Sequence, residues 1–535
     1  MKKLITILFT LLLFHFPTFA QLNIDWQQSY GSMAPDDACD IAETDGGFLV
    51  TGLAESGGGQ VTCFEHGSGG GWLLKIDYTG ELIWQKCFDY AYGLRIVKAI
   101  GSPYYYLIGG AMAEPYPDAL NLWIAKIDTL GNIIWDRSLG NTIGVLGGDQ
   151  YGAATADGGV IGTAQIDSQG GDITHNWGRF DGWLIKLDSL GNTEWDQSIG
   201  SSQTEFINSV LPTTDGGYLA GLYGTPNGIG GNIDCLVTPG PTGPDAIIYK
   251  LDSAGQAEWH QCYGGTGYEG AAFHVEVEDG YLLACYGSST DGDMVGSGWH
   301  EGWYNPRQPT VDVWLVKIDF LGKILWQKCY GGSKSELPHR IFKTSDGGFV
   351  VFANTSSNDG DVSGNLSVGN NTSIWVFKVD KNGVMLWQRC ISGVPYESVA
   401  GVIQQSDYKY TVAGVMTASP TGDVNCSNYV PNYGPDYWVF GVSDTTVNIT
   451  ETSALAVDIK VYPNPAKSVL TIDFPANYDM LNSTIEVINV NGKTSMQSKP
   501  VSHSTQLNIK SLTPGLYIVK IQNNDALITR RLIIQ

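Results

Sequence analysis

Short runs of alternating apolar and polar residues recur along the chain. In one repeated phrase, an alternating run ends in Lys-x-Asp, a turn containing Gly follows, and a second run ends in Trp, as in WLLKIDYTGELIWQKC at 72–87. The closing tryptophans are 51 to 67 residues apart and are Trp84, Trp135, Trp195, Trp259, Trp326 and Trp387. Because a period of two predicts β-strands, each phrase is expected to form a hairpin.

A second phrase, built around an Asp-Gly turn, precedes the first in most units. It reads ETDGGFLVTG at 43–52 and TSDGGFVVFA at 344–353, and Asp-Gly is typical of tight hairpin turns. Each unit therefore contains four strands, which we name a to d in chain order. A repeat of this length made of strands is typical of the blades of a β-propeller.

The seventh c strand, YWVFGVS at 437–443, has no d strand after it. A matching d strand lies at the other end of the chain, where residues 24–31 read IDWQQSYG. We therefore expect an all-β fold in which residues 22–444 form a seven-bladed β-propeller of four-stranded blades, with the N-terminal strand closing the last blade. An open solenoid is the alternative, but it leaves this strand unexplained. The units resemble the DGG-type propeller repeats of secreted bacterial proteins, which specify fold and not function.

The first 20 residues have the pattern of a signal peptide. Lys2 and Lys3 precede an apolar run that ends near Pro17, and small residues allow cleavage after Ala20. No Cys follows the cleavage site, which argues against a lipoprotein. The rest of the chain has no apolar run long enough for a transmembrane helix, so we expect no transmembrane span in the mature protein.

The pattern changes after a polar linker at 445–456. Residues 457–535 alternate strands with Pro-Asn-Pro, Asn-Gly and Pro-Gly turns, which predicts a small Ig-like β-sandwich. They resemble the type A sorting domain of the bacterial type IX secretion pathway. The matching positions are Pro463, Asn464, Pro465, Gly492, Gly515, Tyr517, Arg530 and Arg531.

This resemblance implies export to the outer cell surface or the medium. It also implies that the type IX outer-membrane translocon and its sorting protease act on residues 457–535. A plain carbohydrate-binding sandwich is the alternative for this tail.

The charge distribution limits the partners of the predicted propeller. The net charge is −24, yet residues 457–535 contain more basic than acidic side chains, so residues 21–456 are strongly acidic. Such a body repels phosphate backbones, which makes nucleic acid an unsuitable partner. The charge serves either solubility or cation binding.

The long b–c loops carry the candidate ligand-binding residues. Aromatic side chains there can stack on sugar rings or hold a protein partner, or they can pack the loops onto the blades. The candidates are Trp177, Trp299, Trp303, Tyr304 and Tyr433.

Two of these loops repeat Ser-x-x-Asp-Gly-Asp-x-x-Gly and supply a candidate calcium site. The carboxylates of Asp291, Asp293, Asp359 and Asp361 are hard oxygen ligands suited to Ca²⁺, although Asp-Gly turn geometry explains the same pattern. Cysteines in b–c loops and d strands also suggest two disulfides, Cys63 with Cys87 and Cys235 with Cys262, with small buried residues as the alternative.

No catalytic signature appears: neither His-Glu-x-x-His nor Gly-x-Ser-x-Gly is present. We therefore expect a non-enzymatic binding or adhesion protein that uses the long b–c loop face. The alternatives are an extracellular hydrolase or lyase acting on polysaccharide or peptide, which needs paired carboxylates on that rim, and a structural surface-layer component.

Overall fold

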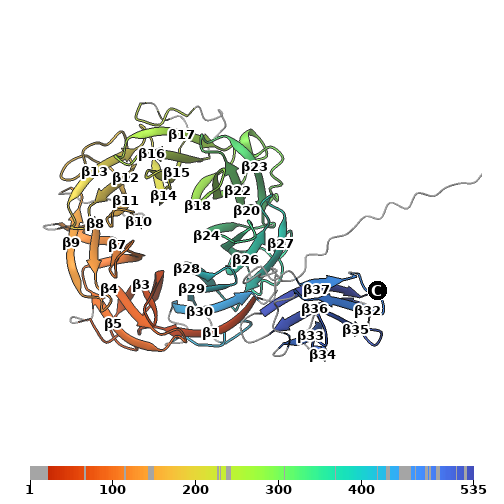
Figure 1. The fold of residues 1–535 in the computed structure, drawn as a ribbon. Coiled ribbons are helices and arrows are strands. Elements are labelled where there is room, and N and C mark those ends of the chain that lie inside the picture. Colours follow the sequence, from red (N-terminus) through yellow and green to blue (C-terminus); the bar gives the residue numbers. More distant parts are fainter. Residues whose placement is uncertain are drawn as a thin grey trace, which may run out of the picture. The chain divides into compact units, whose positions relative to one another are not determined.

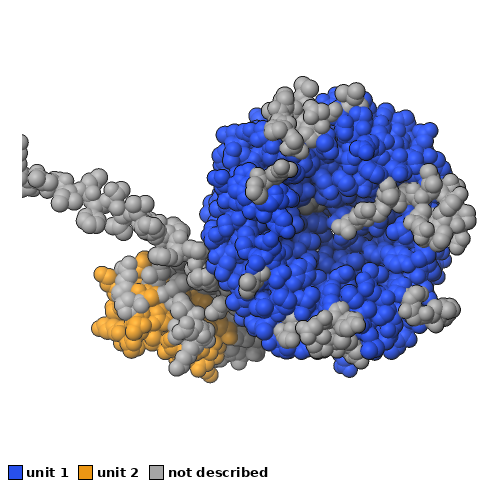
Figure 2. Space-filling view, turned by 180° about the vertical axis from the view of Figure 1, so that it is seen from behind, with its two compact units in different colours: residues 1–445 blue, residues 446–535 orange. Residues whose placement is uncertain are grey.

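The computed structural model describes residues 22–64, 68–113, 116–141, 150–225, 228, 230–235, 243–305, 308–367, 369–417, 420–428, 434–444, 459–463, 465–475, 480, 483–489, 494–513, 515–522 and 527–534. The predicted signal peptide and the linker at 445–456 lie outside these residues. The chain divides into two compact units, residues 1–445 and 446–535, which Figure 2 colours separately.

The described residues of unit 1 form seven four-stranded antiparallel sheets, which we number in chain order. Sheet 1 is β2 (Asp36–Thr44), β3 (Gly47–Ser56), β4 (Ser68–Ile76) and β5 (Leu82–Phe88). Sheet 2 is β6 (Ala91–Lys98), β7 (Tyr105–Ala113), β8 (Tyr116–Ile127) and β9 (Ile133–Leu139). Sheet 3 is β10 (Gly152–Ala154), β11 (Val160–Ile166), β12 (Asp181–Leu187) and β13 (Thr193–Ile199). Sheet 4 is β14 (Glu205–Pro212), β15 (Tyr218–Gly224), β16 (Asp245–Leu251) and β17 (Ala257–Tyr263).

The remaining three sheets continue the same order around a ring (Figure 1). Sheet 5 is β18 (Gly270–Val277), β19 (Gly280–Gly287), β22 (Asp312–Ile318) and β23 (Ile324–Tyr330). Its b–c loop holds a 3₁₀ turn (Gly292–Met294) and a small hairpin of β20 (Trp303–Asn305) and β21 (Gln308–Pro309). Sheet 6 is β24 (Glu336–Lys343), β25 (Phe349–Thr355), β26 (Ser373–Val379) and β27 (Met385–Ile391). Sheet 7 is β28 (Glu397–Ser406), β29 (Lys409–Met416), β30 (Asp436–Asp444) and β1 (Leu22–Tyr30).

The prediction of an all-β fold is confirmed. The predicted pairing of the N-terminal strand with the strand at 437–443 is also confirmed. β1 pairs antiparallel with β30 from Leu22 opposite Asp444 to Tyr30 opposite Tyr437. Sheet 7 also packs on sheet 1, since Val439 shares an apolar cluster with Phe48, and the rings of Trp72 and Tyr437 are 5.0 Å apart. The two ends of unit 1 are therefore joined by strand pairing and by side-chain packing.

A buried tryptophan on strand c anchors six of the seven sheets. In sheet 1 the indole N–H of Trp72 donates to Gln85 Oε1 on strand d at 3.0 Å, and in sheet 3 that of Trp183 donates to Asp196 at 3.0 Å. Sheet 4 has Ile247 at this position. The Gln or Asp after the repeated Trp is thus the acceptor that satisfies a buried donor.

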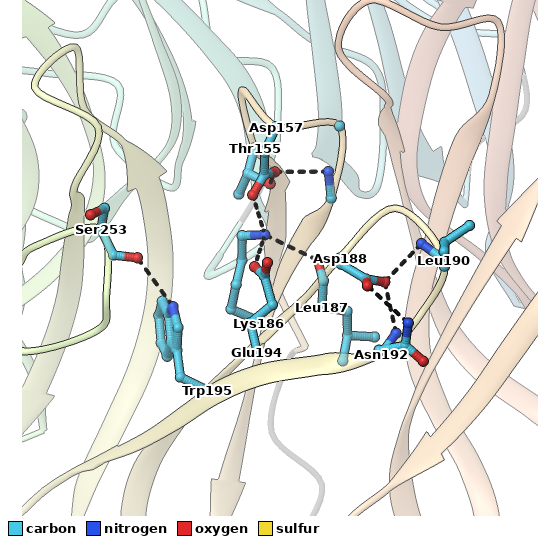
Figure 3. Close-up of polar contacts among 12 residues, drawn as sticks. Thr155, Asp157, Lys186, Leu187, Asp188, Leu190, Asn192, Glu194, Trp195 and Ser253 are labelled. Carbon is cyan, nitrogen blue, oxygen red and sulfur yellow. Dashed lines mark hydrogen bonds and ion pairs between the residues drawn. The ribbon is translucent and has the colours of Figure 1, made fainter.

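The repeated Lys and Asp of strand c fix the two hairpin turns. In sheet 3, Lys186 Nζ lies 2.8 Å from Asp157 in the a–b turn and 2.7 Å from Glu194 on strand d (Figure 3). Asp188 accepts hydrogen bonds from the backbone N–H groups of Leu190 and Asn192 in the c–d turn. The repeated Lys-x-Asp sequence therefore has a structural explanation in the turns.

Where unit 2 is described, its strands form two antiparallel sheets. One is β31 (Lys460–Tyr462), β32 (Val469–Asp473) and β35 (Ser504–Asn508). The other, in spatial order, is β34 (Thr494–Ser498), β33 (Thr484–Asn489), β36 (Gly515–Gln522) and β37 (Leu527–Ile534). Leu470 and Ile472 from the first sheet and Val487 and Val519 from the second lie in one apolar cluster.

The closure of unit 1 generates a prediction about Gln27 on β1. Gln27 Oε1 accepts from the buried Trp438 indole at 3.1 Å and from Asn425 N at 3.0 Å, and its Nε2 donates to the Asp423 carbonyl. Gln27→Ala leaves the indole N–H of Trp438 without this acceptor, so urea denaturation is expected to show a loss of about 1–3 kcal/mol in the free energy of unfolding.

The neighbouring Gln28 is exposed on the same strand and provides the control. Gln28→Ala should change stability by less than about 0.5 kcal/mol. Equal effects of the two substitutions would contradict the role assigned to Gln27.

Candidate functional site

A groove opens between the b–c loop of sheet 5 and the link from sheet 4 to sheet 5. Its volume is about 560 Å³. The link contributes Thr266, Gly267 and Tyr268, and the loop contributes Ser288, Ser289, Thr290, Trp299, Glu301, Trp303 and Pro309. The groove therefore combines aromatic rings, hydroxyl groups and one carboxylate.

The two tryptophans of the groove have different roles. Trp299 is partly buried against the apolar cluster of sheets 4 and 5, and its indole N–H donates to the Thr310 carbonyl at 3.2 Å. Trp303 on β20 is 56% exposed, with its Nε1 3.5 Å from Glu301 Oε1. Trp299 thus fixes the loop, whereas Trp303 presents a ring to solvent.

Tyr304 follows Trp303 on β20 and is 62% exposed. The register of β20 with β21 shifts between Trp303 and Asn305, so Tyr304 lies at an irregularity of the hairpin. Tyr304 is not among the residues that line the groove.

The wall of the groove is fixed by carboxylates that the sequence indicated as calcium ligands. Asp291 Oδ1 accepts from Thr266 N at 2.8 Å and from the Thr266 hydroxyl at 3.2 Å. Asp293 accepts from Gly264 N at 3.2 Å. The two aspartates connect the b–c loop to the link that forms the other side of the groove.

Sheet 6 repeats this arrangement, with an added histidine. Asp359 accepts from Ser333 N at 2.8 Å, and Asp361 accepts from Gly331 N at 3.4 Å. His300 Nδ1 lies 2.8 Å from Asp312, which raises the pKa of the imidazole, and His300 Nε2 lies 4.0 Å from Asp361. Within the described part of the chain, no group of three or more His, Cys, Asp or Glu side chains is arranged to hold a metal ion.

The other predicted aromatics are not part of the groove. Trp177 belongs to the b–c loop of sheet 3, where its ring lies 4.0 Å from that of His175 and its N–H donates to the Ser198 carbonyl. Tyr433 lies outside the described residues. The groove residues Thr266 and Tyr268 were not predicted, since they follow strand d and lie in the link to the next sheet, outside the b–c loops.

Two disulfides join b–c loops to d strands. They are Cys63–Cys87 and Cys235–Cys262, with Cα–Cα distances of 5.4 and 5.7 Å. Among the cysteines that do not form disulfides, Cys285, Cys329 and Cys390 are buried. The pairs considered from the sequence are thus bonded, while the other d-strand cysteines pack as small core residues.

A polar and aromatic cluster bridges strands of the ring interior. The guanidinium of Arg340 lies 4.6 Å from the Phe273 ring and 3.3 Å from Asp40, and that of Arg95 lies 4.1 Å from the Tyr151 ring. Tyr151 and Phe273 are 6.1 Å apart. Among the described contacts of this cluster, Asp40 supplies the carboxylate, and it forms an ion pair with Arg340.

In unit 2 the described sorting-motif positions lie at strand ends and on two paired strands. Gly515 begins β36, and the buried Tyr517 places its hydroxyl 3.0 Å from the Thr513 carbonyl. Arg530 and Arg531 lie on β37, opposite Val519 and Ile518. Pro463 and Pro465 flank Asn464, which like Gly492 lies outside the described residues.

Comparison with protein families identifies this unit. Residues 460–535 match the secretion system C-terminal sorting domain. The C-terminal unit is a type IX sorting domain. This domain marks proteins exported by type IX secretion to the cell surface or outside, and it implies recognition by the type IX machinery. In the described part of the protein, no helix has the length and apolar character needed to cross a membrane.

The sorting domain accounts for a short part of the chain, and other comparisons add only distant similarity. No curated protein matches the sequence. A Dyadobacter fermentans protein of unknown function shows 8% identity and a TM-score of 0.40, covering 79% of this chain and 99% of that one. The phage phi92 endosialidase shows 9% identity and a TM-score of 0.39, covering 95% and 87%. Synechocystis apocarotenoid oxygenase shows 9% identity and a TM-score of 0.35, covering 67% and 72%.

The contacts of Asp291 generate a prediction about the groove wall. Asp291→Ala removes the acceptor that holds Thr266, so the amides of 265–268 should exchange with deuterium faster, by roughly tenfold for a loss of about 1.4 kcal/mol. Hydrogen–deuterium exchange with mass spectrometry measures this change.

Asp359→Ala is the matched control, because it removes the equivalent contact in sheet 6. It should accelerate exchange near Ser333 and leave 265–268 unchanged. An effect of Asp291→Ala that appears only when calcium is present would show that Asp291 acts through a bound ion instead.

Proposed function

We propose that unit 1 is a closed seven-bladed β-propeller and that the protein is a secreted or cell-surface binding protein whose ligand is a glycan. The proposal rests chiefly on one observation: an indole ring more than half exposed lines a groove that also contains several hydroxyl groups and one carboxylate. The face of a sugar ring stacks on an aromatic ring, and its hydroxyls bond to polar side chains, so such a lining suits a saccharide.

The propeller interpretation agrees with the sheet order and with the ends of unit 1. Each sheet follows its neighbour in sequence, and the one exception to chain order is β1, which completes sheet 7. In this arrangement all b–c loops share one rim, where loops can vary while the strands remain rigid. The sorting domain directs export of the protein through the outer-membrane translocon, and the sorting protease then acts on this domain. The loop rim is thereby exposed outside the cell.

An enzyme acting on polysaccharide is the second candidate, and the described carboxylates favour it less. A glycosidase needs two accessible acids about 5–10 Å apart. The acid pairs at the links between sheets, such as Asp181 and Glu205, are buried. The exposed pair Asp37 and Glu55 is not part of the groove, whose lining contains the single acid Glu301. Hydrolysis of any bound glycan by the purified protein would favour this alternative.

A purely structural surface-layer component is the third candidate. It predicts that no ligand binds the groove and that loss of the protein changes the architecture of the cell surface.

Glycan-array binding of the mature protein tests the proposal, followed by calorimetry with the best ligand. Trp303→Ala should weaken binding at least about tenfold, the change expected for a loss of about 1.4 kcal/mol. The melting temperature should stay the same, because the ring is exposed. Tyr304→Ala is the matched control, because its ring is similarly exposed but does not line the groove, and it should bind like the wild type.

Absence of binding to any glycan would overturn the proposed ligand class. Equal losses for the two variants would instead place the site away from the groove.

A further inference from the structure

Five links between neighbouring sheets share one backbone contact. In each, the N–H of an acidic residue at the start of strand a donates to the carbonyl of the residue just before strand c of the preceding sheet. The contacts are Glu205 to Phe180, Glu269 to Pro244, Glu336 to Val311, Glu397 to Thr372 and Asp36 to Pro435, at 2.7 to 3.0 Å. This contact places the acid beside the first residue of strand c.

That first residue is a second acid in four of the five links. The residues are Asp181, Asp245, Asp312 and Asp436, and all are buried. In the link from sheet 3 to sheet 4, both Asp181 and Glu205 are at most 2% exposed. A Cβ atom on Gly200, which follows strand d, would lie 2.2 Å from Asp181 Oδ1, so only a glycine leaves room for this carboxylate.

The hydrogen bonds of this pair are unequal. Glu205 accepts from Ser201 N at 2.9 Å and from the Ser201 hydroxyl at 2.6 Å, as suits an ionised carboxylate. Asp181 Oδ2 accepts from Trp177 N, but its buried Oδ1 has no hydrogen-bond partner among the described residues. In the link from sheet 7 to sheet 1 the strand-a acid Asp36 has such an oxygen: its Oδ2 accepts from Ser32 N, and its buried Oδ1, near Asp436, likewise has no partner in the described part of the chain. A buried carboxylate oxygen without a donor is costly unless it carries a proton and becomes a donor itself.

The fifth link has a neutral residue at this position. Ser373 stands at the start of strand c in sheet 6, where the other links have Asp. Its hydroxyl donates to Asn365 Oδ1 at 2.9 Å. In this link the buried Glu397 therefore does not face a second carboxylate from the start of strand c.

We propose that Asp181 binds a proton and donates it in a hydrogen bond to Glu205, so that the link carries one negative charge and becomes less stable as the pH rises through neutrality. Asp36 shares a proton with Asp436 in the same way at the link between sheets 7 and 1. A bound proton thereby stabilises the contact between sheets 3 and 4 and the contact between sheets 7 and 1.

The groups that face Asp181 support retention of the proton. Glu205 faces Asp181 from the start of β14. The loop before β12 contributes the N–H of Trp177 and carries the exposed Arg179. The link after β13 contributes Ser201, which donates to Glu205. Asp245 lies farther on, beside Glu205 in a cavity of about 20 Å³. Burial, and then the charge of Glu205, raise the pKa of Asp181 to about 7.

The direction of the pH dependence follows from this raised pKa. An unfolded Asp titrates near pH 4, so the folded protein binds the proton more tightly than the unfolded chain does. The stabilisation is complete below about pH 4 and is lost as the pH rises through the folded value near 7.

Thermal unfolding of the mature protein at pH 5 and pH 8 tests the proposal. Asp181→Asn replaces the carboxyl group with a neutral donor of the same shape. We expect its melting temperature to match the wild type at pH 5 and to exceed it by about 2 °C or more at pH 8. Asp167→Asn, an exposed substitution after β11 of the same sheet, should show no such difference.

Two results would overturn the proposal. One is an Asp181→Asn variant that is less stable than the wild type by the same amount at both pH values. The other is a wild type that millimolar CaCl₂ stabilises at pH 8 while Asp181→Asn does not respond, because the pair would then hold a metal ion in place of a proton.

Discussion

The pairing of β1 with β30 is the interaction on which unit 1 depends. It joins the first described strand to the last strand of the repeat region, nearly the whole length of the unit apart in sequence. Without it, β30 would be an unpaired sheet edge, and sheet 7 would lack the Gln27 acceptor for its central tryptophan. The loop-closure entropy of so long a segment opposes this pairing. Apart from the junction of sheets 7 and 1 and the cluster around Arg340, the packing described above joins sheets that are consecutive in sequence.

This constraint also explains why the loops can carry function. Each sheet packs on the next through apolar side chains. In sheets 4, 5 and 7 a strand-d tyrosine adds a hydrogen bond to the next sheet, as where the Tyr263 hydroxyl donates to the Gly322 carbonyl at 2.5 Å. The b–c loops add no strand to this framework and are free to differ. Sheet 5 uses that freedom most visibly, with a 3₁₀ turn and a hairpin that together form one wall of the groove.

The sequence predicted the strands well, because a period of two, Asp-Gly turns and a repeated Trp are local signals. It also indicated Trp299 and Trp303 as site residues, since exposed aromatics stand out in a polar loop. It missed Thr266 and Tyr268 because they reach the groove only through the packing of one sheet on the next. In the Asp-Gly-Asp loops, Asp291 and Asp359 accept hydrogen bonds from backbone N–H groups, as Asp-Gly turn geometry allows, and the calcium site stays a prediction. The buried acid pairs were invisible because their members are separated by more than twenty residues and meet across two sheets.

Hydrogen–deuterium exchange of the mature protein tests the closed ring most directly. If β1 completes sheet 7, the amides of residues 24–30 should exchange as slowly as those of the equivalent strands β13 and β23, and should lose protection together with β30 in denaturant. Fast exchange in β1 and β30, with the other d strands protected, would contradict the account.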